Sequence, residues 1–315
     1  MSMKVTKDLE RLSRGDSPIV TIGNFDGVHL GHQALLKEIV TKAQGVGGES
    51  VVLTFHPHPL VVISPHLEVQ FLTTLDEKLS LFEQAGITHA ICLEFTSQLA
   101  EISPATFVND ILNNRIGVCE LCVGTTFRFG KDRAGTIEDL IRLGPGMGFH
   151  VTPILPVQNG GEIVSSSTIR KCIREGRVSD ARRFLGRQYT IAGVVQKGEQ
   201  NGVAMGYPTA NLPLPADRVI PPNGVYATIA TIDATCHHSV SYIGTRPTFH
   251  GTERLLEVHI FDMESNLYGK HITLGFSEYV RGDMVFSDAT SLSRQIENDV
   301  RHARQTLAVS ETLAY

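Results

Sequence analysis

Short apolar runs alternate with amphipathic stretches along the first half of the chain. Runs such as IVTIG at 19–23 have the length and β-branched content of buried strands. The stretches between them carry apolar residues at helical spacing, and Ser103 followed by Pro104 is a typical helix start. Strands alternating with helices predict an α/β domain with a doubly wound parallel sheet. The expected strands are 19–23, 50–55, 89–95, 117–124 and 149–155, and the expected helices are 33–44, 75–86 and 103–113.

From about residue 188 the pattern changes to short segments in which polar and apolar residues alternate with a period of two. Turns rich in Gly, Pro and Asn separate these segments, which is typical of an antiparallel β-barrel. One terminal helix is expected over about 290–307, with Asp288 or Ser291 as its cap. We therefore place a domain boundary between an N-terminal domain, 1–185, and a C-terminal domain, 186–315.

Length and charge narrow the class of protein. A chain of 315 residues fits two domains, and 28 Lys and Arg against 33 Asp and Glu give a net charge of −5. Without a basic excess, nucleic acid is not expected as the main partner. The polar N-terminus and the absence of a long apolar run argue against a leader or a membrane span. Five cysteines, an odd number, indicate a reduced cytoplasmic protein, and the oligomeric state stays open.

The first candidate site is the segment GNFDGVHLGH, 23–32, between the first expected strand and the first expected helix. Its glycines let the backbone approach a ligand, and the following helix offers N–H groups and a positive dipole end to an anion. His29 and His32 would both face bound phosphates and could donate hydrogen bonds to charge developing on an α-phosphate. The alternative is a Gly-rich turn with incidental surface histidines.

This segment resembles the H-x-G-H signature of the nucleotidyltransferase superfamily. LTFHPHP (53–59), VGTTFRFGKDRAG (123–135) and SSSTIR (165–170) follow in the order seen in the adenylyltransferase module of bacterial bifunctional riboflavin kinase/FAD synthetases. The resemblance implies a Rossmann-like, nucleotidyltransferase-like domain that makes FAD from FMN and ATP. The serine run by itself also reads as a helix N-cap, although hydroxyls and a guanidinium suit phosphate oxygens. The residues expected to bind ATP are Gly23, Asn24, Phe25, Asp26, Gly27, Gly31, Ser166, Ser167 and Arg170, and those implied for the flavin are His58 and Phe127.

The second candidate site lies in the C-terminal half, which has no Walker-type phosphate loop. Glycines at 198, 202 and 206 (Gly198, Gly202 and Gly206) lead into YPTAN, 207–211, and could wrap phosphates with backbone N–H groups. Thr209 and Asn211 alternate onto one side and offer the neutral oxygens that Mg²⁺ accepts.

The stretch around residue 208 resembles the PTAN motif of riboflavin kinases, and the segments of that module follow in order: GVYA (224–227), IGTRPTF (243–249), LEVHIFD (256–262) and LYG (267–269). The resemblance implies that Pro208 joins the glycines at ATP and that Arg281 contacts the flavin. In LEVHIFD, alternation places Glu257 opposite an apolar face. The resemblance makes Glu257 the general base for the 5′-hydroxyl of riboflavin. An exposed strand carboxylate is the alternative.

Over about 15–307 the resemblance implies a cytoplasmic, Mg²⁺-dependent transferase that makes FMN from riboflavin and then FAD, using ATP twice. The chain departs from the usual pattern at Thr126, Thr136, Val203, Tyr242 and Asp283. Where the family usually has Asn, this chain has Tyr242, and Asp283 replaces a frequent Glu. Two alternatives therefore stay open: a riboflavin kinase with weakened or lost FAD synthesis, and a flavin-binding regulator without catalysis.

The C-x-x-C pair of Cys119 and Cys122 is expected to fill the core rather than to hold a metal. Residues three apart in a strand point to opposite faces, so the two thiols should not converge.

Overall fold

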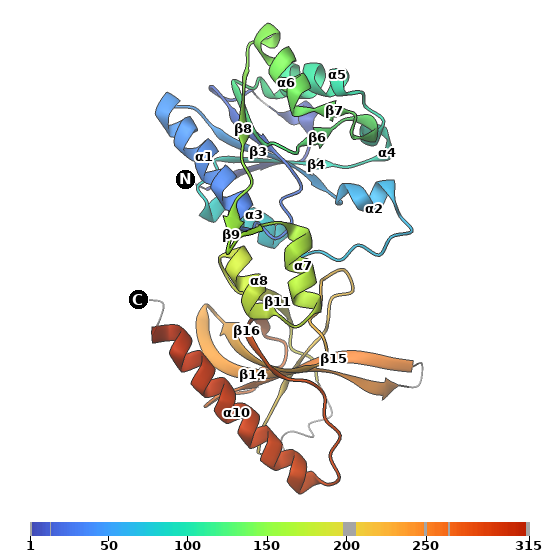
Figure 1. Ribbon diagram of the computed structural model, residues 1–315, viewed down its shortest axis with the longest axis vertical. Helices are drawn as coiled ribbons and strands as arrows, with labels where there is room; N and C mark the ends of the chain where they lie inside the picture. Colours follow the sequence, from blue (N-terminus) through green and yellow to red (C-terminus); the bar gives the residue numbers. More distant parts are fainter. Residues whose placement is uncertain (1, 13, 198–205, 249–250, 264, 313–315) are drawn as a thin grey trace. The chain divides into compact units, whose positions relative to one another are not determined.

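The computed structural model describes residues 2–12, 14–197, 206–248, 251–263 and 265–312. The chain forms two compact units, residues 1–166 and 167–315 (Figure 1). The domain boundary that the sequence predicts after residue 185 stays a prediction. Among the described residues, no helix has the length and apolar character that crossing a membrane requires.

The N-terminal unit is built around a six-stranded sheet with the strand order β1-β4-β3-β2-β5-β8, in which all neighbouring strands are parallel. Its strands are β1 (Lys4–Thr6), β2 (Ile19–Ile22), β3 (Ser50–His56), β4 (His89–Glu94), β5 (Glu120–Gly124) and β8 (His150–Ile154). The helices of this unit are α1 (Leu30–Val46), α2 (Pro59–Ile63), α3 (Leu75–Gln84), α4 (Ser97–Ala100), α5 (Pro104–Thr106), η2 (Phe107–Ile116) and α6 (Ile137–Leu143). Short 3-10 turns (Leu9–Arg11, Lys131–Arg133, Gly144–Met147) and small strands β6 (Arg128–Phe129), β7 (Gly135–Thr136), β9 (Gln158–Asn159) and β10 (Glu162–Ile163) complete it.

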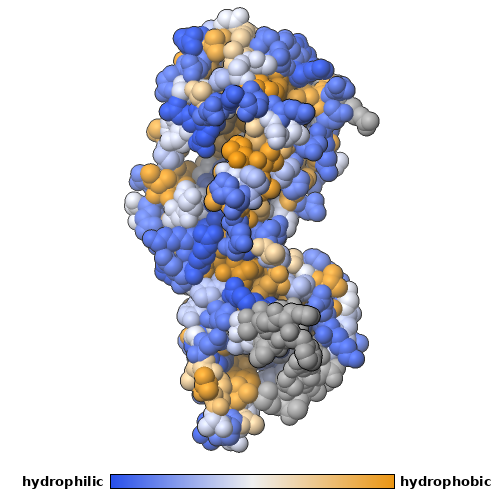
Figure 2. Space-filling model, turned by 90° about the vertical axis from the view of Figure 1, so that its right-hand side faces the viewer, coloured by the Kyte–Doolittle hydropathy of each residue, from blue (hydrophilic) through white to orange (hydrophobic). Residues whose placement is uncertain are grey.

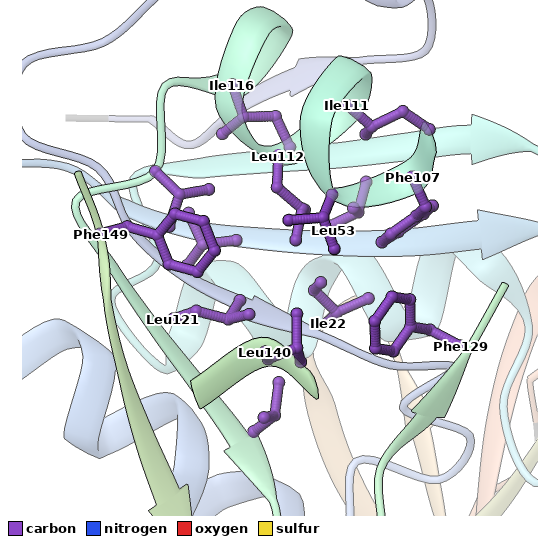
Figure 3. Close-up of a cluster of buried hydrophobic side chains, with 14 of the residues drawn as sticks. Ile22, Leu53, Phe107, Ile111, Leu112, Ile116, Leu121, Phe129, Leu140 and Phe149 are labelled. Atoms are coloured by element: carbon purple, nitrogen blue, oxygen red, sulfur yellow. The ribbon is translucent and has the colours of Figure 1, made fainter. Parts of the chain in front are cut away.

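Both faces of this sheet are buried, as a doubly wound sheet requires. On one face Ile22, Leu53 and Leu121 meet the helices η2 and α6 (Figure 3). On the other face Val52 and Ala90 pack against α1 and α3. Alternate residues of each strand thus serve opposite cores, which explains why the strands appear in the sequence as continuous apolar runs.

Local signals set the helix ends. Ser103 accepts a hydrogen bond from the backbone N–H of Thr106 and caps α5, as the sequence predicts. The helix then continues with wider π-type turns to Ile116 and ends at Gly117, whose φ of 72° is left-handed. Helix α1 begins three residues earlier than expected because His29 is its cap, and Gly47 ends it with a φ of 65°.

The C-terminal unit is an antiparallel six-stranded sheet with the order β11-β16-β13-β14-β15-β12. An isolated antiparallel bridge between Gln196 and Asn211 joins the β11 end of the chain to β12, so the sheet curls toward a barrel. The strands are β11 (Tyr189–Val194), β12 (Ala210–Leu212), β13 (Gly224–Ile232), β14 (Thr235–Thr248), β15 (Gly251–Ile260) and β16 (His271–Arg281). The helices are α7 (Ser166–Arg174, which starts at the last residue of the first unit), α8 (Val178–Leu185) and α10 (Ala289–Thr312).

Helix α10 covers one face of the antiparallel sheet. Its Ala303 and Leu307 are buried against Val225 and Ala227 of β13. The carboxylate of Asp288 accepts a 2.7 Å hydrogen bond from the backbone N–H of Ser291, so Asp288 rather than Ser291 is the cap. The predicted fold class is confirmed: a parallel α/β domain of the nucleotidyltransferase type, followed by an antiparallel barrel-like sheet with a terminal helix.

Candidate active sites

The loop after β2 lies where the strand order of the parallel sheet reverses. From β2, the sheet continues through β3 and β4 on one side and through β5 and β8 on the other. Ligand crevices in doubly wound sheets form at this position, beyond the carboxyl ends of the strands. The predicted ATP-binding segment, 23–32, starts where β2 ends and leads directly into α1. The fold therefore places this segment where a nucleotide would be expected to bind.

His29 is the N-cap of α1, and its ring has a defined tautomer. Its Nδ1 accepts a 3.3 Å hydrogen bond from the backbone N–H of His32. In the neutral ring the proton then lies on Nε2, which is the form that donates from Nε2 to an oxygen. A Cβ on Gly31 would lie 3.2 Å from the His29 ring, so glycine lets the ring lie close to the first turn of the helix. The side chain is 6% exposed.

His32 stacks on His29, with 3.6 Å between the ring centroids and 16° between the planes. Phe25 contacts the His32 ring edge-on at 5.0 Å. Burial lowers the pKa of His32 well below its usual value, and the nearby His29 and Lys78 lower it further. The Nδ1 atom of His32 is buried, and no described residue offers it a hydrogen bond. Because a buried polar atom without a partner is costly, this atom is ready to bond to a ligand or a water molecule.

The backbone of the loop is strained at two non-glycine residues. Phe25 and the β-branched Val28 have φ values of 51° and 38°, in the left-handed region. Such conformations cost about 1–3 kcal/mol each and persist where the surrounding structure enforces them, often at functional sites. Both side chains are 1% exposed, so packing into the core holds the loop in this shape.

The side chain of Asp26, a residue predicted to bind ATP, forms hydrogen bonds with other residues of the protein. Its carboxylate accepts hydrogen bonds from the backbone N–H groups of Leu72 and Thr73 at 2.9 Å and 3.2 Å. Its carbonyl oxygen accepts a 2.8 Å hydrogen bond from the hydroxyl of Ser166. In this structure Asp26 shapes the loop, and Ser166 joins the loop from a distant part of the chain.

Other predicted residues at the edge of the parallel sheet are His58, which follows β3, and Phe127, which follows β5. Because β3 and β5 flank β2 in parallel, their ends lie at the same edge as the ATP loop. His58 Nδ1 accepts a 3.2 Å hydrogen bond from the backbone N–H of Leu60, and Phe127 is half-buried. Ser167 is exposed and Arg170 half-buried on α7, which belongs to the second unit from residue 167 onward.

The register of the antiparallel sheet brings the residues of the second predicted site together. Asn211 of β12 lies directly opposite Glu257 of β15. Directly opposite side chains in an antiparallel pair share a face. Leu256 and Val258 point into the core at 0% and 1% exposure, whereas Glu257 and Asn211 are half-buried on the other face. The sheet thus brings the predicted general base next to a predicted metal ligand.

A cavity of about 260 Å³ lies beside the same edge strand. Thr209 and Ala210 line it from the β12 side, and Val258 and Ile260 line it from β15. The rest of its wall is the segment after β15, which contains Leu267 and Tyr268 of the LYG motif. The lining residues of that segment are Met263, Ser265, Asn266, Leu267 and Tyr268, with Val195 and Pro208 completing the wall.

The donor set at this edge fits Mg²⁺ rather than a softer metal. A threonine hydroxyl and an amide oxygen lie on one short strand segment, and a carboxylate lies across from it. Hard cations such as Mg²⁺ take such oxygens together with water and substrate phosphates. Among the described residues no group of three or more His, Cys, Asp or Glu could hold a metal ion.

Three further sets of residues named in the sequence remain to be placed. Gly198 and Gly202 lie outside the described residues, while Gly206 is exposed with a φ of 81°. Arg281, implied for the flavin, makes a 2.7 Å ion pair with Asp299 of α10. The core-filling role holds for Cys122, which is 0% exposed, but is wrong for Cys119, which precedes β5 and is exposed.

Comparisons with known proteins cover both units. A FAD synthetase family model matches residues 13–168, and a riboflavin kinase family model matches residues 185–307. Over 312 residues the chain is 33% identical to the bifunctional riboflavin kinase/FMN adenylyltransferase of Escherichia coli K12, across 98% of this chain and 99% of that protein. The protein of the same name from Pseudomonas fluorescens is 37% identical over 299 residues, across 93% of this chain and 94% of its own length.

A solved structure described as a macrolide-efflux protein from Streptococcus pneumoniae superimposes with a TM-score of 0.89 at 27% identity, covering 96% of this chain and 99% of that one. Its description applies to that protein, and the likeness supports a shared fold. With both family models matched and full-length relatives above 30% identity, the chain belongs to the family of bifunctional riboflavin kinases/FMN adenylyltransferases.

Proposed function

We propose that the two activities of this flavin-synthesising transferase reside at the two sites described above. FMN adenylylation takes place at the 23–32 loop, and riboflavin phosphorylation takes place at the edge strand β12. Support comes from the agreement between the matched family ranges and the two constellations, since each range contains one of them. The substrates are riboflavin, FMN and ATP, and the products are FMN, FAD, ADP and pyrophosphate.

In the adenylyl transfer, the phosphates of ATP lie over the N-terminus of α1, whose backbone N–H groups favour anions. An oxygen of the FMN phosphate attacks the α-phosphorus of ATP, and pyrophosphate leaves. His29 donates from Nε2 to the charge that develops on the phosphate oxygens. His32, kept neutral by its lowered pKa, stacks behind His29 and holds the ring in place. Ser166, whose hydroxyl donates to the carbonyl oxygen of Asp26, helps to hold the ATP loop in shape.

In the kinase reaction, Glu257 accepts the proton of the riboflavin 5′-hydroxyl while that oxygen attacks the γ-phosphorus of ATP. ADP then leaves. The cavity beside β12, which Pro208 and Thr209 line from the chain that leads into β12, receives the nucleotide. Thr209 and Asn211 would hold Mg²⁺, which when bound neutralises charge on the transferring phosphates.

The observation that carries the kinase assignment is the direct pairing of Asn211 with Glu257. A metal ligand and a general base must both reach one γ-phosphate, and neighbouring strands in register satisfy that need. The odd number of cysteines in the sequence supports a reducing compartment such as the cytoplasm as the proposed location.

Single substitutions separate the two sites. Glu257→Ala should lower the kcat for riboflavin phosphorylation by about 10²–10⁴-fold, because it removes the general base, and should leave FMN adenylylation within twofold. His29→Ala should lower FMN adenylylation by about 10²–10³-fold, as loss of a preorganised donor does, and should spare the kinase. Chromatography of the products formed from riboflavin and from FMN, each with ATP and Mg²⁺, measures both activities.

Matched controls are available in each unit. His150→Ala removes an exposed histidine of the parallel sheet, and Glu278→Ala removes a half-buried strand carboxylate of the antiparallel sheet. Both controls should keep both activities. Equal loss of the two activities in Glu257→Ala or in His29→Ala, with the controls active, would show that the roles are allocated wrongly.

A further inference from the structure

The strand that carries Glu257 directs a second polar side chain to the same face of the sheet. Glu257 and His259 are two residues apart in β15, so their side chains project to one side. Val258 between them points into the core at 1% exposure, whereas His259 is half-buried. The ladder between β12 and β15 ends at the pair of Ala210 and Val258, so His259 lies one step beyond it. The kinase reaction proposed above gives His259 no role.

His259 forms a hydrogen bond with the segment that leads into β12. Its Nδ1 atom lies 2.9 Å from the carbonyl oxygen of Pro208, 51 residues away in the sequence. A carbonyl oxygen can only accept a hydrogen bond, so Nδ1 carries a proton and donates it to this contact. The contact therefore ties β15 to the peptide group that joins Pro208 to Thr209.

This side-chain contact extends the attachment of the segment past the end of the backbone ladder. Asn211 is held by backbone pairing on both sides, to β15 and to the chain that follows β11. Thr209 precedes the first ladder residue, Ala210. Pro208 has no N–H group with which the ladder could continue. The imidazole of His259 thus holds the backbone at the point where the strand pairing stops.

The peptide group that His259 holds lies at the wall of the cavity beside β12. Pro208 and Thr209 both line that cavity. Val258 and Ile260, the neighbours of His259 along β15, line it as well. A rotation of the 208–209 peptide group would therefore move part of the wall and the threonine hydroxyl together. Loss of the hydrogen bond should loosen both.

Aromatic contacts fix the orientation of the His259 ring. Tyr207 meets it edge-on, with 5.4 Å between the ring centroids and 81° between the planes, and Phe261 lies 5.9 Å away. The guanidinium of Arg304 from α10 lies 4.4 Å from the centroid of Phe261 and donates two hydrogen bonds to the carboxylate of Asp262, at 2.9 Å and 2.8 Å. A ring packed in this way is already oriented to donate to the backbone of the facing segment.

We propose that His259 is a positioning residue of the riboflavin kinase site, which holds the carbonyl group of Pro208, fixes Thr209 at the cavity wall and thereby sets the affinity for ATP. This inference rests on the kinase site and the nucleotide cavity proposed above. His259 acts through the backbone and transfers no proton in the reaction. The general base and the positioning residue then come from the same face of one strand, two residues apart.

Two substitutions in the full-length protein test the kinetic effect. His259→Leu removes the donor but keeps an apolar side chain of similar bulk. It should raise the KM for ATP in riboflavin phosphorylation by roughly three- to tenfold, the range expected for one net hydrogen bond, with kcat within twofold. His259→Asn keeps an N–H donor on the atom bonded to Cγ, where Nδ1 lies in histidine, and should bring this KM back toward the wild-type value. Initial rates of FMN plus FAD formation at saturating riboflavin measure both.

Amide hydrogen exchange tests the positioning without nucleotide or metal. In protein treated with a chelator, peptides that cover residues 207–212 should exchange three- to tenfold faster in His259→Leu than in the wild type. The reason is that the lost hydrogen bond lets this segment open more often. His259→Asn should restore the slower exchange. Peptides from the parallel sheet should exchange at the same rate in all three proteins.

His237→Leu is a matched control. His237 is another half-buried histidine of the same antiparallel sheet, and it pairs with Ala230 in the β13–β14 hairpin. Its substitution should change neither the KM for ATP nor the exchange of residues 207–212. FMN adenylylation should stay at the wild-type rate in all the variants, which reports that each protein is folded.

An unchanged KM for ATP or unchanged exchange of residues 207–212 in His259→Leu would overturn the proposal. So would an effect confined to kcat, the same effects in His237→Leu, or a failure of His259→Asn to restore the wild-type values. The kinase site itself is judged separately by Glu257→Ala in the same assay. If that variant still phosphorylates riboflavin, the site is misplaced whatever His259 does; if it is inactive and His259→Leu behaves as wild type, only the positioning role fails.

Discussion

At the scale of single residues, the same side chain often serves both chemistry and folding. His29 is expected to bind phosphate, and the structure adds that its Nδ1 caps α1, which fixes the tautomer. Asp26 looks like a ligand in the motif but is bonded to backbone N–H groups at 72–73. Residue type and spacing reveal which groups could react. They do not reveal which of these groups are already hydrogen bonded to other parts of the folded chain.

Two buried histidines make the N-terminal unit sensitive to acid. Burial lowers the pKa of His32 and, with the charge of Lys4, that of His89, whose Nε2 lies 2.9 Å from Thr6 Oγ1. Each folded-state pKa is below the unfolded value of about 6.5, so the unfolded chain binds more protons once the pH falls below that value. The free energy of unfolding should be flat above pH 7 and should fall as the pH drops from about 6.5 to 5.

Calorimetric unfolding at pH 5 to 8 measures this dependence. His89→Gln, which cannot be protonated, should unfold with a shallower pH slope than the wild type over pH 5 to 6.5. An identical slope in the variant would show that His89 does not contribute to the acid sensitivity.

At the scale of elements, caps explain one departure from the family pattern. Thr136 stands where an acidic residue is usual, and it is the N-cap of α6. Its hydroxyl accepts from the backbone N–H of Asp139, and the Asp139 carboxylate accepts from the backbone N–H of Thr136, at 3.2 Å and 3.1 Å. Aspartate and threonine are both good N-caps, so the exchange preserves the role of the position. Thr136 therefore gives little reason to expect weakened FAD synthesis.

Thr136→Ala should cost about 0.5–2 kcal/mol of stability by removing the cap, while the kcat for FMN adenylylation stays within twofold. Thr136→Ser keeps a capping hydroxyl and should restore the Tm. Thermal unfolding and product formation from FMN measure the two effects. A tenfold loss of adenylylation at unchanged Tm would instead support the alternative in which this module is the weakened one.

At the scale of the whole molecule, two compact units each carry a core and a proposed site. The intermediate FMN is a small, freely dissolving molecule, so nothing in the proposed chemistry requires both sites to lie in one chain. The first reaction only has to supply FMN to the second.

A mixture of the His29→Ala and Glu257→Ala proteins should therefore convert riboflavin to FAD, although neither protein does so alone. FAD should appear after a lag that shortens as the concentration of the Glu257→Ala partner rises. Time courses by chromatography follow the three flavins. Accumulation of FMN without FAD in the mixture would show that FMN must pass between the two sites of one molecule.

The strands, helix caps and turns of this protein can be predicted from its sequence. Apolar runs, helix caps and the Gly-rich turn depend on neighbouring residues, and alternation along LEVHIFD already places Glu257 on the polar face. Strand order and register depend on contacts between distant segments, which periodicity does not encode. Only the tertiary structure pairs Asn211 with Glu257 and brings the Ser166 hydroxyl to the carbonyl oxygen of Asp26 across 140 residues. The sequence therefore shows which reactive side chains the protein has, and the tertiary structure decides which of them lie close to one another.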